Sequence, residues 1–221
     1  LISSRLLSSK IKKTVLKYVS DKEFWQRDAE KLRGYFGNLY KEEDLFHNHS
    51  GDYEFIYRLP LIQYKVIEGQ LTIVGINEGS ELVAKEFLKH KTIPLGNAVF
   101  TNFETQLEIK TEELRVTEEL FSYRFETPWL PINQKNLKAY KNGELDLDRV
   151  LSNNILTIFK GCKIEADKKI MVKGEYEEKS IKMKDIHMIG FGGSFVTNVK
   201  IPEYLGLGSR GANGFGCVVN K

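Results

Sequence analysis

Regular spacing of apolar residues predicts most of the elements in the first half of the chain. Residues 10–19 partly alternate between apolar and polar side chains, which predicts a strand. In residues 27–39 the apolar side chains recur at helical spacing, which predicts an amphipathic helix that closes near Gly37. Residues 55–67 and 70–76 alternate again on either side of the turn at Glu68-Gly69, which predicts two paired strands.

Two further elements complete a recognisable order. The segment Asn77-Glu78-Gly79-Ser80 predicts a turn that ends in a helix N-cap at Ser80, and a short helix follows it. Residues 99–109 predict another strand. The resulting order is strand, helix, strand, strand, helix, strand, which is that of a ferredoxin-like (βαββαβ) domain. We therefore expect residues 1–110 to form a first domain.

The second half of the chain predicts the same order with one helix reduced. Its longest predicted helix begins at Asp148, and its predicted strands are residues 114–125, 169–176, 181–191, 194–200 and 215–219. A glycine-rich loop region takes the place of the second helix. The sequence thus predicts an α+β fold of two tandem ferredoxin-like domains, the second comprising residues 111–221.

That loop region, residues 206–216, has five glycines in eleven positions and is called the glycine run below. Glycine permits positive φ and lets backbone N–H groups approach a ligand closely. The run also matches G-x-G-x-x-G, but a dinucleotide site needs a βαβ unit around this motif, and only ten residues follow Gly211. The run therefore predicts binding of another phosphate-rich ligand, RNA. The predicted contacts are Gly206, Gly208, Ser209, Arg210, Gly211, Gly214 and Gly216.

Two histidines, His47 and His49, stand one residue apart in the loop after the first predicted helix. In an extended segment both side chains point the same way, which suits either two proton-transfer groups or two metal ligands. A zinc site needs a further ligand, and the other histidines and the carboxylates show no recognisable spacing, so no metal site is predicted. Two solvated loop histidines are the remaining alternative.

An aromatic and cationic stretch, residues 53–65, follows the histidines. Aromatic faces stack on bases, and cations such as Arg58 and Lys65 pair with phosphates. The alternative is an ordinary strand whose apolar side chains belong to the core. Tyr57, Tyr64 and Lys65 remain candidates for a functional role.

Composition narrows the setting in which such a site would work. The chain has 221 residues, 41% of them hydrophobic, and a net charge of +3, so any nucleic-acid surface must be local. Two cysteines are too few for a disulfide framework, which favours a reducing, cytoplasmic setting. No apolar stretch reaches the roughly 18 residues of a membrane span. No cofactor is indicated.

Four features taken together carry a family resemblance: Glu30-Lys31-Leu32-Arg33-Gly34, the histidine pair, residues 57–65 and the glycine run. Across nearly the whole chain they resemble the CRISPR repeat-processing endoribonucleases of the RAMP superfamily. The resemblance implies cleavage of CRISPR repeat RNA in precursor transcripts, without metal, to give 2′,3′-cyclic phosphate and 5′-hydroxyl ends. It also implies that His47 and His49 are catalytic and that Tyr57 assists them.

The sequence departs from that family in two places. The glycine run carries a single cation, Arg210, where relatives often have more, and the lysine-rich segment before Trp25 does not match their compact N-terminus. The chief alternative is a non-catalytic RNA-binding RAMP subunit of a CRISPR effector complex, and a metal-dependent nuclease is a third reading. Association with other effector subunits and formation of a homodimer are left open.

Overall fold

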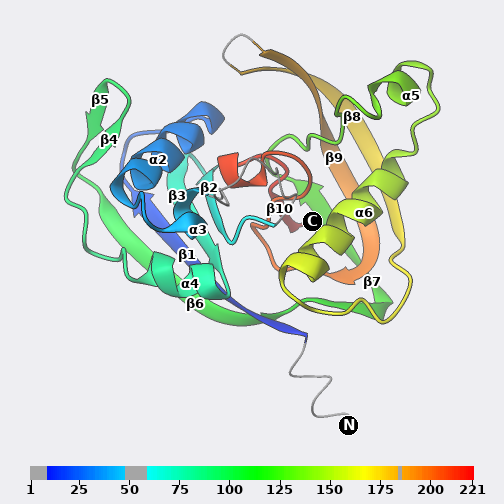
Figure 1. The fold of residues 1–221 in the computed structure, drawn as a ribbon, viewed down its shortest axis with the longest axis horizontal. Coiled ribbons are helices and arrows are strands. Elements are labelled where there is room, and N and C mark those ends of the chain that lie inside the picture. The colour runs from blue at the N-terminus through cyan, green and yellow to red at the C-terminus, as the bar shows by residue number, and fades with distance from the viewer. Residues whose placement is uncertain (1–8, 48–58, 184–185) are drawn as a thin grey trace. The chain divides into compact units, whose positions relative to one another are not determined.

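A computed structural model describes residues 9–47, 59–183 and 186–221 of the chain (Figure 1). The chain divides into two compact units. The first unit extends to Glu112 and also includes Ala212–Gly214 of the glycine run. The second unit comprises Glu113–Gly211 and Phe215–Lys221. The glycine run therefore contributes to both units.

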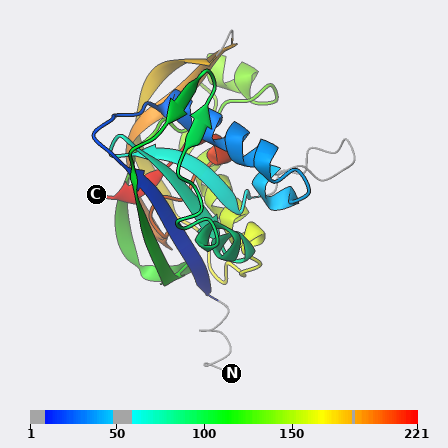
Figure 2. The same cartoon turned by 90° about the vertical axis from the view of Figure 1, so that its left-hand side faces the viewer.

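The first unit is a four-stranded sheet with helices on one face (Figure 1). Its elements are β1 (Lys10–Val19), α2 (Gln26–Leu39), α3 (Asp44–His47), β2 (Ile62–Ile67), β3 (Gln70–Ile76), α4 (Glu78–Ala84), β4 (Ile93–Leu95), β5 (Ala98–Phe100) and β6 (Glu104–Glu113). The strand order is β2-β3-β1-β6, and β3 pairs antiparallel with both β1 and β2. In Figure 2, β1 and β6 run side by side. Strands β4 and β5 form a separate small sheet.

The periodicity of β1 and of α2 brings their apolar side chains into one core. Leu16 and Tyr18 of β1, Leu32 and Phe36 of α2, and Ile73 of β3 are all fully buried in this core. Burying one such side chain contributes roughly 1.5–3 kcal/mol. The apolar stripe of α2 therefore fixes the helix against the sheet, and its polar residues other than Asp28 are not buried.

The second unit is built around another four-stranded sheet. Its elements are β7 (Arg115–Phe125), α5 (Leu137–Lys141), α6 (Leu147–Gly161), β8 (Val172–Met183), β9 (Ile186–Lys200), the short 3₁₀ helix η1 (Gly211–Asn213) and β10 (Val218–Asn220). The order is β10-β7-β9-β8, so the fourth strand lies beside the first, the first beside the third, and the third beside the second, as in the first unit. The predicted α+β fold of two tandem ferredoxin-like domains is confirmed. Among the described residues, no helix is long and apolar enough to cross a membrane.

Two expectations for the first unit were wrong in detail. The strand expected over residues 99–109 is two strands, β5 and β6, and Asn102 between them has a φ of 56°, which interrupts an extended chain. Helix α4 begins at Glu78, after Asn77, and not after an N-cap at Ser80. The Ser80 hydroxyl instead lies 2.6 Å from the hydroxyl of Thr14 on β1, which ties the helix to the sheet.

One expectation for the second unit also needs correction. The three strands expected between residues 169 and 200 are two longer ones, β8 and β9. Gly193 keeps β9 paired at the point where a break was expected: its φ is 105°, and a Cβ there would lie 2.1 Å from the carbonyl oxygen of Glu175. Only glycine allows this close approach of the two backbones.

Candidate functional site

The predicted catalytic residues lie at the edge of what the structure describes. His47 is the last residue of α3, and the structure places its backbone but does not describe its side chain. His49 and Tyr57 lie outside the described residues. Their catalytic roles therefore stay predictions, whereas the element that carries His47 can be examined.

Helix α3 is held in place by Phe46, the residue before His47. Phe46 is 2% exposed. Its ring stacks on Tyr40, with centroids 4.6 Å apart and planes at 24°, and on Phe36 of α2, at 6.0 Å and 11°. Stacked rings of this kind add to the gain from burial. The aromatic stack of Phe36, Tyr40 and Phe46 therefore fixes the backbone of α3, which ends at His47, beside the end of α2.

Two further candidates, Tyr64 and Lys65, are internal residues of β2. Tyr64 is fully buried with its ring centroid 6.0 Å from that of Phe36, and this burial raises the pKa of its phenol. Lys65 pairs with Thr72 of β3 and is 0% exposed. These positions do not support direct contact of either side chain with RNA. Strand β2 is buried on both faces, whereas alternation of apolar and polar residues is typical of a strand buried on one face only.

The glycine run is exposed over only three of its residues. Gly208 and Arg210 are exposed and Ser209 is half-buried, whereas the other predicted contacts in the run, Gly206, Gly211, Gly214 and Gly216, are buried. The exposed stretch belongs to the second unit. If the run binds a ligand directly, this stretch is where it does so.

The surroundings of residue 208 in the second unit require a glycine at that position. Its φ is 78°, and a Cβ would lie 2.7 Å from Nε1 of Trp129 and 2.9 Å from Oδ1 of Asn154. Trp129 Nε1 donates a hydrogen bond of 2.9 Å to this Asn154 oxygen. The backbone of Gly208 also bridges to Leu130. Trp129 and Asn154 thus form the support beneath the exposed stretch, and no sequence motif announced them.

Gly214 has a different task, within the first unit. The side-chain amide of Gln26, in the first turn of α2, donates to the carbonyl oxygen of Asn213 at 3.0 Å. At Gly214 φ is 88°, and a Cβ would lie 3.0 Å from the carbonyl oxygen of Tyr64 and 3.2 Å from Cβ of Ala29. Gly214 is therefore a close-packing position against α2 and β2 rather than an open surface.

Arg210 is the cation of the exposed stretch. Its φ is 57°, an unusual value for a residue with a side chain, and its Nη1 lies 3.3 Å from Sδ of Met183 at the end of β8. The Ser209 backbone N–H donates to the carbonyl oxygen of Leu130 at 3.3 Å. The guanidinium is thus presented beside the end of the β8–β9 hairpin, where a phosphate group could pair with it.

The described residues offer no recognisable metal-binding geometry. They include no group of three or more histidine, cysteine, aspartate or glutamate side chains placed to hold a metal ion. This statement does not extend to His47 and His49, because their side chains are not described.

Both halves of the chain match models of known protein families. The model of the Cas6b N-terminal domain matches residues 9–113, and that of the Cas6b C-terminal domain matches residues 115–221. The chain belongs to the Cas6b family. The resemblance to CRISPR-associated repeat-processing endoribonucleases that the sequence motifs carried is confirmed at the level of the family.

Several relatives of this Cas6b-family chain are similar over most of its length. A crystal structure described as Cas6b is 33% identical with a TM-score of 0.88, covering 96% of this chain and 100% of its own. A second, described as the CRISPR RNA processing endoribonuclease Cas6b, is 29% identical with a TM-score of 0.75 and the same coverage. An uncharacterized protein of Methanocaldococcus jannaschii is 33% identical over 138 residues, which is 60% of this chain and 94% of that protein.

Replacing Gly208 tests whether the exposed stretch depends on the support beneath it. Gly208→Ala places a Cβ against Trp129 and Asn154, so we expect a loss of about 2–3 kcal/mol in the free energy of unfolding from overpacking and backbone strain together. The matched control is Gly143→Ala, where φ is 71° but no atom lies within 4 Å of the added Cβ. It should lose only the backbone term, about 1 kcal/mol. Equal losses in urea unfolding would contradict a supporting role for Trp129 and Asn154.

Proposed function

We propose that this Cas6b-family chain is an endoribonuclease that cleaves CRISPR repeat RNA within precursor transcripts. The observation that carries the proposal is the match of both halves of the chain to the two Cas6b domains. A relative that is 29% identical across its full length is described as a CRISPR RNA processing endoribonuclease. The proposal joins this relationship to His47 at the end of α3, to His49 two residues further along the sequence, and to the exposed cation Arg210 of the glycine run.

The reaction proposed is attack of a ribose 2′-hydroxyl on the adjacent phosphorus, without a metal ion. A bond forms between the 2′-oxygen and phosphorus while the bond from phosphorus to the 5′-oxygen breaks. One of the two histidines, His47 or His49, removes the 2′-hydroxyl proton through its imidazole, and the other delivers a proton to the departing 5′-oxygen. The products are a 2′,3′-cyclic phosphate and a 5′-hydroxyl. Histidine suits both roles because it exchanges protons near neutral pH.

Other side chains would stabilise and hold the RNA during this step. Negative charge grows on the phosphoryl oxygens during attack, and the Tyr57 phenol is the proposed donor to them. The exposed stretch of the glycine run, with Arg210, is proposed to contact the RNA backbone. Its buried glycines contribute by shaping the run, as the surroundings of Gly214 and Gly216 support: a Cβ at Gly216 would lie 2.0 Å from the carbonyl oxygen of Leu207.

The alternative function is a non-catalytic subunit that retains RNA without cutting it. Such a subunit would use the same fold and the same glycine run. Two adjacent proton carriers favour the enzyme, because binding alone does not require them. The two functions are separated by incubating a labelled repeat RNA with excess protein and measuring retention and cleavage together.

The metal-independent reaction predicts that cleavage depends on one oxygen of the substrate, the 2′-hydroxyl oxygen next to the scissile bond, and not on a metal ion. Cleavage of repeat RNA should persist in EDTA and should stop when the one nucleotide before the scissile bond is 2′-deoxy, since the attacking oxygen is then missing. Gel analysis of single-turnover reactions measures both effects. RNA carrying the 2′-deoxy substitution at a distant nucleotide is the control and should be cut normally. Full cutting at the substituted site would exclude attack by the 2′-hydroxyl.

The histidine pair predicts a loss of rate without a loss of binding. The double variant His47→Ala/His49→Ala should cleave roughly 10²-fold or more slowly than the wild type, because both proton transfers lose their catalyst. Its dissociation constant for repeat RNA should stay nearly unchanged. His187→Ala, which removes an exposed histidine on β9, is the matched control and should cleave saturating RNA at the wild-type rate. Wild-type turnover in the double variant would move the site elsewhere in the chain.

A further inference from the structure

A buried hydrogen-bond cluster lies beside the aromatic stack that holds α3. Its centre is the carboxylate of Glu86, whose side chain is 3% exposed. Tyr40 Oη donates to Oε2 of Glu86 at 2.6 Å, and Nε2 of His90 lies 2.7 Å from the same oxygen. Lys89 Nζ donates to Oε1 at 2.8 Å. Because an ionised carboxylate only accepts hydrogen bonds, His90 must carry a proton on Nε2.

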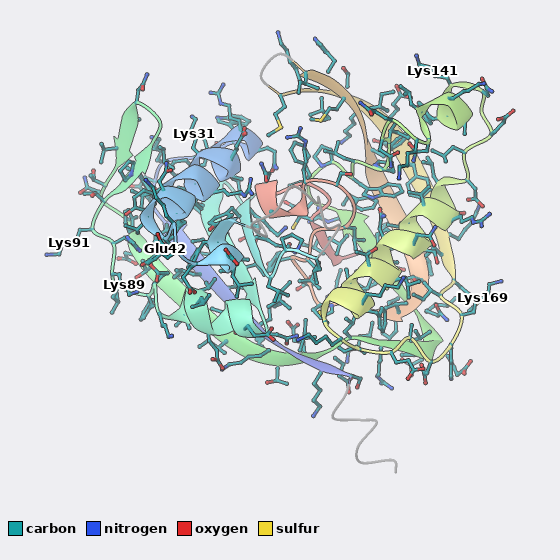
Figure 3. All side chains as sticks on the ribbon, viewed as in Figure 1. Lys31, Glu42, Lys89, Lys91, Lys141 and Lys169 are labelled. Carbon is teal, nitrogen blue, oxygen red and sulfur yellow. The ribbon has the colours of Figure 1, made fainter. Side chains whose placement is uncertain are left out.

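The cluster joins segments that are distant in the sequence. Tyr40 is the C-cap residue of α2, whereas Glu86, Lys89 and His90 belong to the turn after α4, where Lys89 is labelled in Figure 3. Tyr35 of α2 completes it, with Oη 3.1 Å from Nδ1 of His90. The cluster thus connects the end of one helix to the segment that follows the other.

The electrostatic balance keeps Glu86 ionised and Tyr40 protonated. Burial alone would raise the pKa of Glu86, but the hydrogen bonds from His90, Lys89 and Tyr40 outweigh it and hold that pKa below its usual value. Burial, and next the hydrogen bond to Glu86, raise the pKa of the Tyr40 phenol. At neutral pH the phenol is therefore a permanent donor and the carboxylate a permanent acceptor.

A buried carboxylate is not the simplest way to fill this space. Well-packed apolar residues often serve stability as well as or better than a buried charge does. What a fully satisfied polar cluster adds is a defined direction for each of its side chains. Here the defined side chain is Tyr40, whose hydroxyl is held by Glu86 while its ring face contacts Phe46.

The Tyr40 ring connects this cluster to α3, because its hydroxyl bonds to Glu86 and its face stacks on Phe46. Helix α3 has only four residues, DLFH, too few to be stable by its own hydrogen bonds. Its position depends on Phe46, which stacks on Tyr40, and on the backbone bond of 3.1 Å from Glu43 N–H to the Tyr40 carbonyl oxygen. A change in the direction of the Tyr40 ring would move Phe46, and His47 follows Phe46 directly.

We propose that Glu86 is a positioning residue for RNA cleavage: acting through the Tyr40 hydroxyl and the stack of Tyr40 on Phe46, it fixes the backbone of α3, the helix that ends at His47. The inference rests on the proposed function, because it assigns no chemistry to Glu86 itself. It adds to that function a group remote in sequence from the histidine pair, which no motif in the chain marks.

Two variants loosen the cluster while retaining its shape. Tyr40→Phe keeps the ring on Phe46 and removes the hydroxyl, and Glu86→Gln keeps the side-chain size and removes the charge. Each should lower the single-turnover cleavage rate about tenfold, since a small misplacement of a catalytic group is costly, and should leave the dissociation constant for repeat RNA unchanged. The matched control is Tyr35→Phe, the same chemical change at the His90 end of the cluster. It should cleave within about twofold of the wild type.

A double-mutant cycle separates positioning from general destabilisation. If Tyr40 acts through His47, adding Tyr40→Phe to His47→Ala should cause no further loss of cleavage rate. A purely structural role would lower the rate by the same factor in both backgrounds and would lower it in Tyr35→Phe in proportion to the fall in melting temperature. If Glu86→Gln does not fold, the cycle with Tyr40→Phe still decides the question.

The outcomes distinguish this inference from the proposed function. Wild-type cleavage by folded Tyr40→Phe, or equal losses in the two backgrounds, would overturn the positioning role while leaving the histidine mechanism intact. Wild-type cleavage by His47→Ala combined with His49→Ala would instead overturn the mechanism, and with it the inference. A tenfold loss confined to the background with His47 present would support both.

Discussion

The stacking of Phe46 on Phe36 and Tyr40 is the contact on which the proposed active site depends. A helix of four residues cannot hold itself, so α3 takes its place from these rings and from the core beneath them. The core in turn exists because α2 places Leu32 and Phe36 against the sheet. The apolar stripe of α2 therefore contributes to the core of the first unit and, through Phe36, also holds α3, which ends at His47.

A second constraint, the close approach of backbones, shapes the other functional element. Gly208 and Gly216 have positive φ and would meet neighbouring atoms if they carried a Cβ. Their absent side chains let Gly208 pack on Trp129 and Asn154 and let Gly216 pack on the backbone of Leu207 within the run, and a short stretch ending in Arg210 is left at the surface. Four of the five glycines are buried and thus shape the run rather than form its exposed surface.

Periodicity predicted those parts of the fold that depend on local sequence. The bounds of β1 are those expected, whereas α2 begins one residue earlier than expected and continues to Leu39, past the end expected near Gly37. Breaks caused by a single backbone angle were missed, as at Asn102, and so was the continuity of β9 through Gly193. Both depend on neighbouring strands, which a pattern within one strand does not report.

Sequence motifs marked some residues of the candidate site, but they did not mark the residues that only tertiary packing brings together. The histidine pair and the glycine run were found because their spacing is unusual, and the Cas6b family models agree with the resemblance they carry. Lys65 looked like a surface cation beside aromatic residues, but β2 is an edge strand that is buried on both faces, and Lys65 is buried with it. The cluster around Glu86 had no signal at all, because Tyr40 and His90 are joined only by tertiary contacts.

The reaction proposed for this chain is attack of a 2′-hydroxyl on the adjacent phosphorus of repeat RNA, with protons moved by His47 and His49. The most direct measurement is the end chemistry of a cleaved repeat RNA, by mass spectrometry of both fragments. We expect a 2′,3′-cyclic phosphate on the upstream fragment and a 5′-hydroxyl on the downstream one. A 5′-phosphate with a free 3′-hydroxyl would contradict the account, because those ends require water as the nucleophile.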